Sequence, residues 1–374
     1  MKSNFSVPRI VLKILLALVI ISIIGVLVFV GLTISGKNRL YRKNENKKPD
    51  LSGLAQNLEQ IVNESGETET EKTPEIVLVE EDNDNWEEGD IRYKGVHYRY
   101  NDQILTFLFL GIDHEGSVKQ KSKDGYGGQS DSIFLLVLNP KTNQASLIGV
   151  NRDTMTDVAV YSNTGVYLMT TKEQIALQHA YGDGKEQSCE RSVDAVSNLF
   201  YNLPIHAYCS INYGAVPKIN DAVGGIDLVM KDDVTNDNGK ILYAKGQKVH
   251  LKGSKATEFL RARDCNASES ARARTERQKQ YLLAYADKAK EAIKKDPKLF
   301  VTLFNTISKY TVTDITVDEV AYFSTQVADY RFDSEHMYSL QGETKMGDKY
   351  EEFYVDEKAM FELILTVFYD VIDD

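Results

Sequence analysis

Arginines are concentrated in one short segment of an otherwise acidic chain. The eighteen residues from Arg261 to Gln278 contain five arginines, whereas the whole chain has a formal net charge of -11. A guanidinium is permanently charged and planar, and it can bind two phosphate oxygens at once. The segment therefore predicts a phosphate or pyrophosphate site, and a solvated basic helix face is the alternative interpretation.

The spacing of these arginines predicts which of them converge. Arg274 and Arg277 are three residues apart, so in a helix they share one face, which Gln278 continues. Arg272 falls on a different face, where we expect it to be solvated. If Arg261 and Arg263 lie in extended chain, their side chains point the same way. Four arginines could then converge from two elements.

Three further junctions between apolar and polar sequence could supply carboxylates. Asp113 follows one apolar run, Asp131 lies at the start of the next, and residues 151–154 (Asn-Arg-Asp-Thr) follow a third. Loops at strand ends are where α/β proteins place ligand groups, although each junction alone could be an ordinary turn. Asp113 and Asp131 could hold Mg²⁺, which takes one or two carboxylates together with phosphates and waters.

The elements that must position these residues alternate between strands and helices. Nearly continuous apolar runs predict buried strands at 105–112, 132–138 and 146–150, and shorter strands are expected at 207–211 and 226–229. Helical stretches are expected at 172–181, 191–201, 215–222, 254–260 with Ser254 as N-cap, and 270–295 closed by Pro297. The pattern predicts an α/β (mixed α+β) fold with a central mixed sheet sandwiched between helices.

Two hairpins are also expected. Residues 91–112 alternate tyrosine and polar residues, turn at Asn101-Asp102 and enter the first apolar strand, and residues 241–251 suggest a hairpin around 244–247. The last eighty residues predict two or three helices with short strands and no separate chemistry.

Composition and motif searches exclude several classes of protein. With 374 residues, 42% hydrophobic and 26% charged, the chain can bury a large core. The common hydrolase, protease and nucleotide-binding signatures are absent. The three cysteines, Cys189, Cys209 and Cys265, form no C-x-x-C pair, which argues against structural zinc. An acidic chain without a DNA-reading module is a poor candidate for a nucleic-acid partner.

The N-terminus predicts a single transmembrane helix. Residues 14–36 contain no charge and are dominated by Ile, Leu and Val, and as a helix they span roughly 34 Å, enough to cross a bilayer. A cleaved signal peptide is the alternative, but the run is too long and lacks a convincing cleavage site. We expect a short N-terminal segment at 1–13, the span at 14–36, a polar tether at 37–90 and a folded domain at 91–374, with the motifs in 104–300.

The charges around this span leave its orientation open. Basic residues after the span, from Lys37 to Lys48, outnumber those before it. The positive-inside count taken literally would place the domain in the cytoplasm. Large C-terminal domains can nevertheless translocate despite flanking charge, so this count is weak evidence.

Taken in order, the motifs resemble the LytR-CpsA-Psr family of bacterial cell-envelope phosphotransferases. The matching segments are the membrane anchor, LFLGID at 108–113, QSDSIFLLVLNPKT at 129–142, SLIGVNRDT at 146–154, QHAYGDG at 178–184, INDAVGGIDL at 219–228, LKGSKATEFLRAR at 251–263 and RTERQ at 274–278. The resemblance covers roughly residues 91–300. Each motif alone is unspecific, but seven in the same order are improbable by chance.

The resemblance implies a membrane-anchored enzyme with its N-terminus in the cytoplasm and its catalytic domain outside. Such an enzyme holds a polyprenyl chain in an apolar tunnel and transfers a glycopolymer, such as teichoic acid or capsule, from undecaprenyl pyrophosphate to a sugar hydroxyl of peptidoglycan. Undecaprenyl phosphate is released. By position, Asp113 and Asp131 correspond to the Mg²⁺ ligands. The residues corresponding to the pyrophosphate-binding set are Arg152, Arg261, Arg263, Arg274, Arg277 and Gln278.

Within this implied reaction, Arg152, Asp153 and Arg263 are the expected catalytic residues. Asp153 could be the general base or could pair with Arg152 to orient it. The chain departs from the family pattern at Gln129, where an arginine is usual, at residues 176–178 and at Ala273. Two other interpretations stay open, the first of them because Gln129 removes one expected phosphate contact. One is a non-catalytic module that binds a lipid-linked glycan, and the other is a hydrolase of the same polyprenyl-pyrophosphate glycan.

Overall fold

A computed structural model describes residues 27–54, 76–78, 86–118, 127–264, 267–296, 298–326 and 329–372. Its centre is a six-stranded sheet in the order β14-β9-β4-β5-β6-β15. The strands are β4 (Leu105–Ile112), β5 (Ser130–Asn139), β6 (Gln144–Val150), β9 (Ala207–Asn212), β14 (Thr311–Thr313) and β15 (Arg331–Ser339). β4 and β9 are parallel, as are β6 and β15, whereas the other neighbours are antiparallel.

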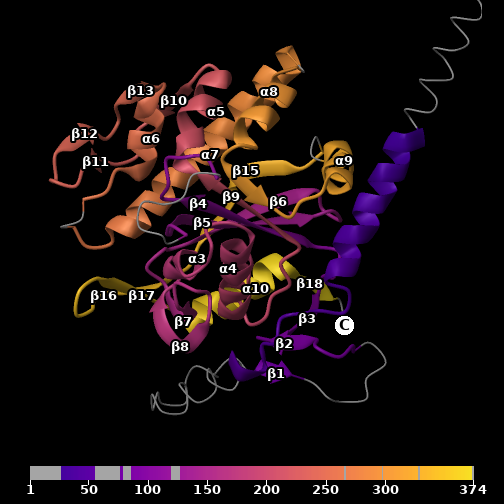
Figure 1. Cartoon of the computed structure of the whole chain (residues 1–374). Helices are drawn as coiled ribbons and strands as arrows, with labels where there is room; N and C mark the ends of the chain where they lie inside the picture. Colours follow the sequence, from indigo (N-terminus) through magenta and orange to yellow (C-terminus); the bar gives the residue numbers. More distant parts are fainter. Residues whose placement is uncertain are drawn as a thin grey trace, which may run out of the picture.

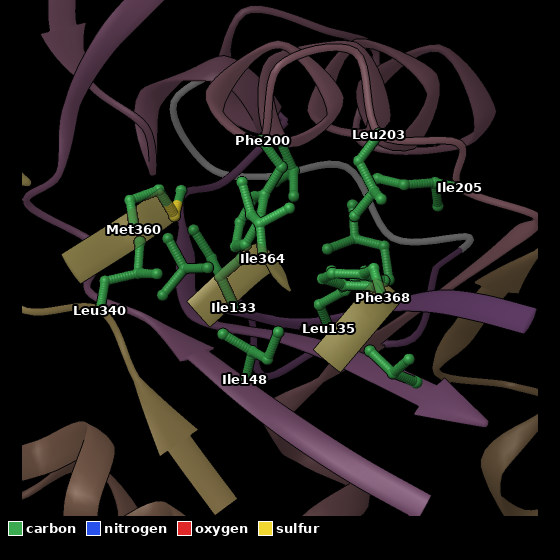
Figure 2. Close-up of a cluster of buried hydrophobic side chains, with 14 of the residues drawn as sticks. Ile133, Leu135, Ile148, Phe200, Leu203, Ile205, Leu340, Met360, Ile364 and Phe368 are labelled. Atoms are coloured by element: carbon green, nitrogen blue, oxygen red, sulfur yellow. The ribbon is translucent and has the colours of Figure 1, made fainter. Parts of the chain in front are cut away.

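One face of the sheet is covered by α4 (Glu186–Leu199) and α10 (Glu357–Phe368) (Figure 1). Alternate strand residues point to this face, because successive side chains in a strand project to opposite sides. Figure 2 shows Ile133, Leu135 and Ile148 of the sheet below Phe200, which directly follows α4, and below side chains of α10. On α10 these are Met360, Ile364 and Phe368, which recur every four residues and so form one helical face.

The opposite face carries a second group of helices (Figure 1). These are α5 (Val216–Ala222), α6 (Ser254–Arg261), α7 (Ser270–Lys295) and α8 (Lys298–Ile307). Their own apolar cluster includes Phe259 of α6 and Tyr281 of α7. α7 also contacts β6 and β15 directly. Helices therefore lie on both faces of a mixed sheet, which confirms the predicted fold class.

Short strands flank this second group of helices. β10 (Ile226–Val229) pairs with β13 (Lys248–Leu251), and β11 (Val234–Thr235) pairs with β12 (Ile241–Tyr243). The prediction of one hairpin over 241–251 was therefore wrong. Its two halves, β12 and β13, pair with different strands instead of with each other.

The structure also separates the two halves of the predicted 91–112 hairpin. β3 (Val96–Tyr100) pairs with β2 (Ile91–Tyr93) and with β18 (Tyr369–Ile372) in a second sheet that also includes β1 (Ile76–Leu78), whereas β4 belongs to the central sheet. The turn at Asn101-Asp102 thus links two sheets. The partner of β3 comes from the C-terminus, which local sequence could not reveal.

The prediction of a helix at 172–181 was wrong for the first residues of this range. β7 (Met155–Tyr161) and β8 (Tyr167–Gln174) form a hairpin, and only α3 (Leu177–Ala180) is helical. Ser254 is also not an N-cap, because it is the first residue of α6 and Gly253 precedes it. A second hairpin, β16 (Gly342–Met346) with β17 (Glu351–Val355), runs beside the first, and Thr154 bridges to Phe353.

A helix over residues 27–43 packs against the domain at α9 (Val317–Gln326), while its apolar start projects away from the body (Figure 1). Ser35 donates a hydrogen bond of 2.8 Å to Asp318, and Leu40 is fully buried. Leu51 and Leu54 are buried as well, so this part of the expected tether packs on the domain.

Among the described residues, no helix combines the length and the apolar character needed to cross a membrane. Residues 14–26 of the expected span lie outside the described residues, as do residues 1–13, residues 55–75 of the expected tether, Cys265 and Pro297.

Candidate active site

The three polar junctions meet at one end of the central sheet. β4 and β6 both run antiparallel to β5, so the ends of β4 and β6 lie beside the start of β5. The backbone N–H of Asp113, just after β4, donates to the carbonyl oxygen of Gln129, just before β5, at 3.0 Å. The predicted convergence of these loops is therefore present in the structure.

Asp131 occupies an irregular position in β5. Gly111 pairs with Ser132 and Ile112 pairs with Ser130, so Asp131 is left without a partner on β4. Such a β-bulge bends the strand and redirects a side chain. The Asp131 side chain is 8% exposed, and a buried carboxylate requires charged or hydrogen-bonding partners.

Two arginines supply those partners. Arg152 Nη1 donates to Asp131 Oδ1, and Arg274 Nη1 lies 3.4 Å from Asp131 Oδ2. Arg274 Nη2 also lies 3.3 Å from the backbone oxygen of Asp131. One carboxylate thus holds two guanidiniums that come from the loop after β6 and from α7.

Gln129 has a specific contact in this arrangement. Its side-chain oxygen accepts a hydrogen bond from Arg152 Nη2, while Arg152 Nε lies 3.3 Å from Asp153 Oδ1. Where the family resemblance leads us to expect an arginine, this chain therefore has a neutral acceptor that orients another arginine. A second arginine at this position would instead add positive charge next to Arg152.

The close approach of α7 to β6 depends on Gly149. A Cβ placed on Gly149 would lie 2.8 Å from Cγ2 of Thr275, closer than real Cβ contacts allow. Thr275 follows Arg274 on α7, so the absent side chain lets this turn of the helix lie against the sheet. Arg274, on the same turn of α7, reaches Asp131 from this position.

Asp113 and Arg261 form the more exposed part of the site. Arg261 Nη2 lies 2.7 Å from Asp113 Oδ1, and these side chains are 37% and 44% exposed. The guanidinium also lies over the ring of Tyr213, 5.2 Å from its centre. Because both charged groups remain accessible, an incoming phosphate could reach them without crossing the buried cluster.

Asp153, which is buried, and Arg263, which is partly exposed, form a third pair. Arg263 Nη2 lies 3.5 Å from Asp153 Oδ2, and Arg263 Nε donates to Ser270 Oγ at 2.8 Å. Burial raises the pKa of Asp153, although the charges of Arg152, Arg263 and Arg274 oppose this effect. A carboxylate with raised proton affinity is suited to proton transfer.

Arg277 and Gln278 point toward α6. Arg277 donates to the carbonyl oxygen of Phe259 at 2.7 Å and also to that of Ala262. Gln278 Nε2 donates to the carbonyl oxygen of Leu260 at 3.2 Å. Burial, together with the charge of Arg274, lowers the pKa of Arg277 to about 10. Both side chains therefore hold the end of α6, from which Arg261 and Arg263 extend.

The structure modifies the predicted geometry of the arginines. Arg261 is the last residue of α6 and does not lie in extended chain. It pairs with Asp113, whereas Arg263 pairs with Asp153, so the two arginines serve different carboxylates. Arg272 is 51% exposed and pairs with Glu269, as expected for a solvated face. Among the described contacts, Arg152 and Arg274 both bind Asp131.

Sequence reasoning missed two polar residues that adjoin the site. Gln174, at the end of β8, donates from Nε2 to Asp153 Oδ1 at 3.0 Å and to the backbone oxygen of Glu351 at 2.8 Å. Glu351, at the start of β17, lies 3.6 Å from Arg263 Nη2. A turn signal at residues 162–165 (Ser-Asn-Thr-Gly) could have indicated the β7–β8 hairpin and hence Gln174. No local signal distinguishes Glu351 from its acidic neighbours.

Comparison with known proteins identifies relatives of this chain. The model of the LytR_cpsA_psr family matches residues 60–366. A 159-residue stretch is 33% identical to the polyisoprenyl-teichoic acid-peptidoglycan teichoic acid transferase TagU of Bacillus cereus, covering 42% of this chain and 44% of that protein. The corresponding transferase TagV of Bacillus subtilis is 29% identical over 194 residues, covering 50% and 44%. The chain thus spans less than half the length of these curated relatives.

Solved structures share the fold. The crystal structure of Bacillus subtilis TagV aligns with a TM-score of 0.52 and 23% identity, over 71% of this chain and 96% of that one. Protein gbs0355 of Streptococcus agalactiae aligns with a TM-score of 0.54 and 20% identity, over 71% and 86%. At these identities the likeness concerns the arrangement of the sheet and helices.

Proposed function

The chain belongs to the LytR_cpsA_psr family, and we propose that it is a cell-wall glycopolymer transferase. Its donor is a glycopolymer on an undecaprenyl pyrophosphate carrier, its acceptor is a sugar hydroxyl of peptidoglycan, and undecaprenyl phosphate is released. The printed names of TagU and TagV, teichoic acid transferases acting on peptidoglycan, support this class of donor and acceptor.

The observation that carries the proposal is the shared carboxylate of Asp131. Two guanidiniums that bind it, from Arg152 and Arg274, are held side by side at the end of the sheet. Arg261 lies on the neighbouring Asp113, which is joined to the β5 start through Gln129. Preorganised positive groups of this kind stabilise the charge that develops on phosphate oxygens during phosphoryl transfer.

Asp113 and Asp131 would also hold Mg²⁺. Within the described residues, no three His, Cys, Asp or Glu side chains are grouped so that they could hold a metal ion. The protein ligands would therefore be these two carboxylates, and phosphates and waters would complete the shell. That donor set fits magnesium, which prefers oxygen and usually keeps several non-protein ligands. The cation, when bound, would neutralise charge on the pyrophosphate. Arg152, Arg261 and Arg274 would orient the phosphate oxygens.

The location of the domain is part of the same proposal. We infer that residues 14–36 anchor the chain in the cell membrane, with the N-terminus in the cytoplasm and the domain outside. The exposed apolar start of the helix over residues 27–43, including Leu27 and Phe29, supports a continuation into the membrane. The pyrophosphate donor and peptidoglycan acceptor would then be on the same side as the site.

The test is direct transfer by the full chain in detergent or lipid vesicles. The protein is incubated with Mg²⁺, a synthetic polyprenyl pyrophosphate glycan and peptidoglycan fragments, and products are identified by mass spectrometry. We expect a phosphate-linked glycan on the acceptor, which is lost in Arg152→Ala and Arg263→Ala and on chelation of the metal. Arg272→Ala, at an exposed position on α7, is the matched control.

Each alternative gives a different result in this assay. Free phosphorylated glycan formed without an acceptor would identify a hydrolase. Binding of the donor without any product would identify a non-catalytic module, and retention of normal transfer by Arg152→Ala would overturn the assigned site.

A further inference from the structure

We propose that Glu351 is a positioning residue of this site, which shares Arg263 with Asp153 and thereby makes Asp153 the proton acceptor for the attacking hydroxyl. This inference rests on the proposed transferase function. Glu351 lies in the C-terminal hairpin, far in sequence from the arginine motifs.

The geometry places one guanidinium between two carboxylates. Arg263 Nη2 lies 3.5 Å from Asp153 Oδ2 and 3.6 Å from Glu351 Oε2. The side chains of Asp153 and Glu351 are only 4% and 10% exposed, so water screens their charges poorly. Two buried negative charges that share one positive charge favour binding of a proton.

The hairpin holds Glu351 firmly in this position. The N–H of Phe353 donates to the backbone oxygen of Asp153 at 2.9 Å, and the Phe353 side chain is buried. The amide of Gln174 connects Asp153 Oδ1 with the backbone oxygen of Glu351. Glu351 Oε1 in turn accepts the N–H of Glu269 at 3.0 Å, directly before α7.

The charged groups around Asp153 together define its proton affinity. Asp153 is faced by Arg152 on its own loop, by Arg263 after α6, by Arg274 on α7 and by Glu351 on β17. Arg152 and Arg274 both bind Asp131 as well, so their charge is shared. Burial is the main cause of the raised pKa of Asp153, and the charge of Glu351 acts in the same direction.

The two oxygens of Asp153 differ in their hydrogen bonds, and Oδ2, which faces Arg263 at 3.5 Å, is the one we assign as the proton acceptor. Oδ2 is buried and accepts no hydrogen bond within the described part of the chain, whereas Oδ1 accepts from Gln174. In the transfer step, the acceptor hydroxyl oxygen forms a bond to the sugar-bearing phosphorus, and its proton moves to Asp153 Oδ2. The bond from that phosphorus to the bridging oxygen breaks, and undecaprenyl phosphate leaves with the electron pair.

Glu351→Gln separates charge from shape. The amide oxygen can still accept the N–H of Glu269, but the negative charge is removed. In the full-chain transfer assay we expect the acidic limb of the kcat/KM profile to move down by about 0.5–1 pH unit. We also expect kcat to fall roughly 3–10-fold because Asp153 becomes a weaker base, with little change in KM for the donor. Glu343→Gln, on the exposed face of the same hairpin, is the matched control.

A thermal-unfolding measurement tests the charge coupling without relying on transfer. Because the folded protein raises the pKa of Asp153, it binds more protons than the unfolded chain, and this residue's contribution makes stability fall as pH rises through the titration. Glu351→Gln should reduce that slope. In an Asp153→Asn background the same substitution should change the slope no further.

The two measurements distinguish failure of this inference from failure of the proposed function. If the wild-type chain transfers glycan but Glu351→Gln changes neither the pH limb nor the unfolding slope, the role of Glu351 is overturned. If the chain does not transfer glycan but Glu351→Gln still reduces the pH dependence of stability, the transferase proposal fails. The electrostatic coupling of Glu351 to Asp153 then stands. Equal effects of Glu343→Gln and Glu351→Gln would also contradict the inference.

Discussion

Arg274 lies 143 residues after Asp131 in the chain, yet its Nη1 atom is 3.4 Å from Asp131 Oδ2. This contact joins α7 to the bulge in β5 and fixes one guanidinium of the proposed pyrophosphate site. Both side chains are almost fully buried. Loss of either charge would therefore affect the stability of the fold as well as the charge of the site.

Replacing Arg274 should damage both stability and transfer. Arg274→Ala leaves the buried Asp131 with fewer charged partners, which we expect to destabilise the domain by about 1–3 kcal/mol. Loss of one preorganised positive group should lower kcat about 100-fold or more. Arg272→Ala, two residues earlier on the exposed face, should change neither quantity appreciably. Urea unfolding and the transfer assay measure both effects, and equal behaviour of the two variants would contradict the assignment.

Gly149→Ala tests whether the close approach of α7 positions Arg274. The added methyl group would meet Thr275 Cγ2, so α7 must shift or strain the sheet, at about 1–3 kcal/mol. A displacement of the arginine by even about 1 Å can reduce turnover about 100-fold. Gly53→Ala is the control because nothing lies within 4 Å of its Cβ position. Normal transfer by Gly149→Ala would show that this contact does not set the geometry.

Arg277→Ala should act through α6. Loss of the guanidinium leaves the carbonyl oxygens of Phe259 and Ala262 without their charged donor, at about 1–3 kcal/mol. We expect faster amide hydrogen exchange over residues 259–264, together with weaker transfer because Arg261 and Arg263 extend from this segment. If exchange stays slow while donor binding is lost, Arg277 contacts the donor directly.

We expect two buried histidines to make the folded protein less stable in mild acid. Burial lowers the pKa values of His179 and His206 to about 4, so each is neutral in the folded protein where the unfolded chain would be protonated. The folded state therefore binds fewer protons, and stability falls as pH drops from about 6.5 toward 4. Each histidine contributes up to about 3 kcal/mol to this loss.

The histidine prediction is checked by unfolding midpoints between pH 7 and pH 4. His206 Nδ1 accepts the N–H of Thr106 at 3.1 Å, an interaction that protonation at this nitrogen would break. His206→Gln should be less stable at pH 7 but should show a shallower decline in acid. A decline as steep as in the wild type would refute the contribution of His206.

The sequence alone determined most of the central architecture. Continuous apolar runs identified β4, β5 and β6, and helical spacing with its boundaries identified α7 at residues 270–295. Strands and helices of this kind are set by residues close together in the chain, so their pattern can be recognised in the local sequence. The residue types at Asp113, Asp131 and Arg152 also indicated a charged site at the strand ends, because such loops gather at one edge of a sheet.

Only the tertiary structure decided which charges meet. The sequence could not show that β3 pairs with the C-terminal β18, that Arg261 and Arg263 bind different carboxylates, or that Arg277 holds α6. Glu351 is identical in type to Glu352 beside it, yet Glu351 contacts Arg263 while Glu352 accepts a hydrogen bond from the exposed Tyr354. The difference arises because adjacent residues of a strand face opposite sides, and packing of Phe353 decides which side faces the site.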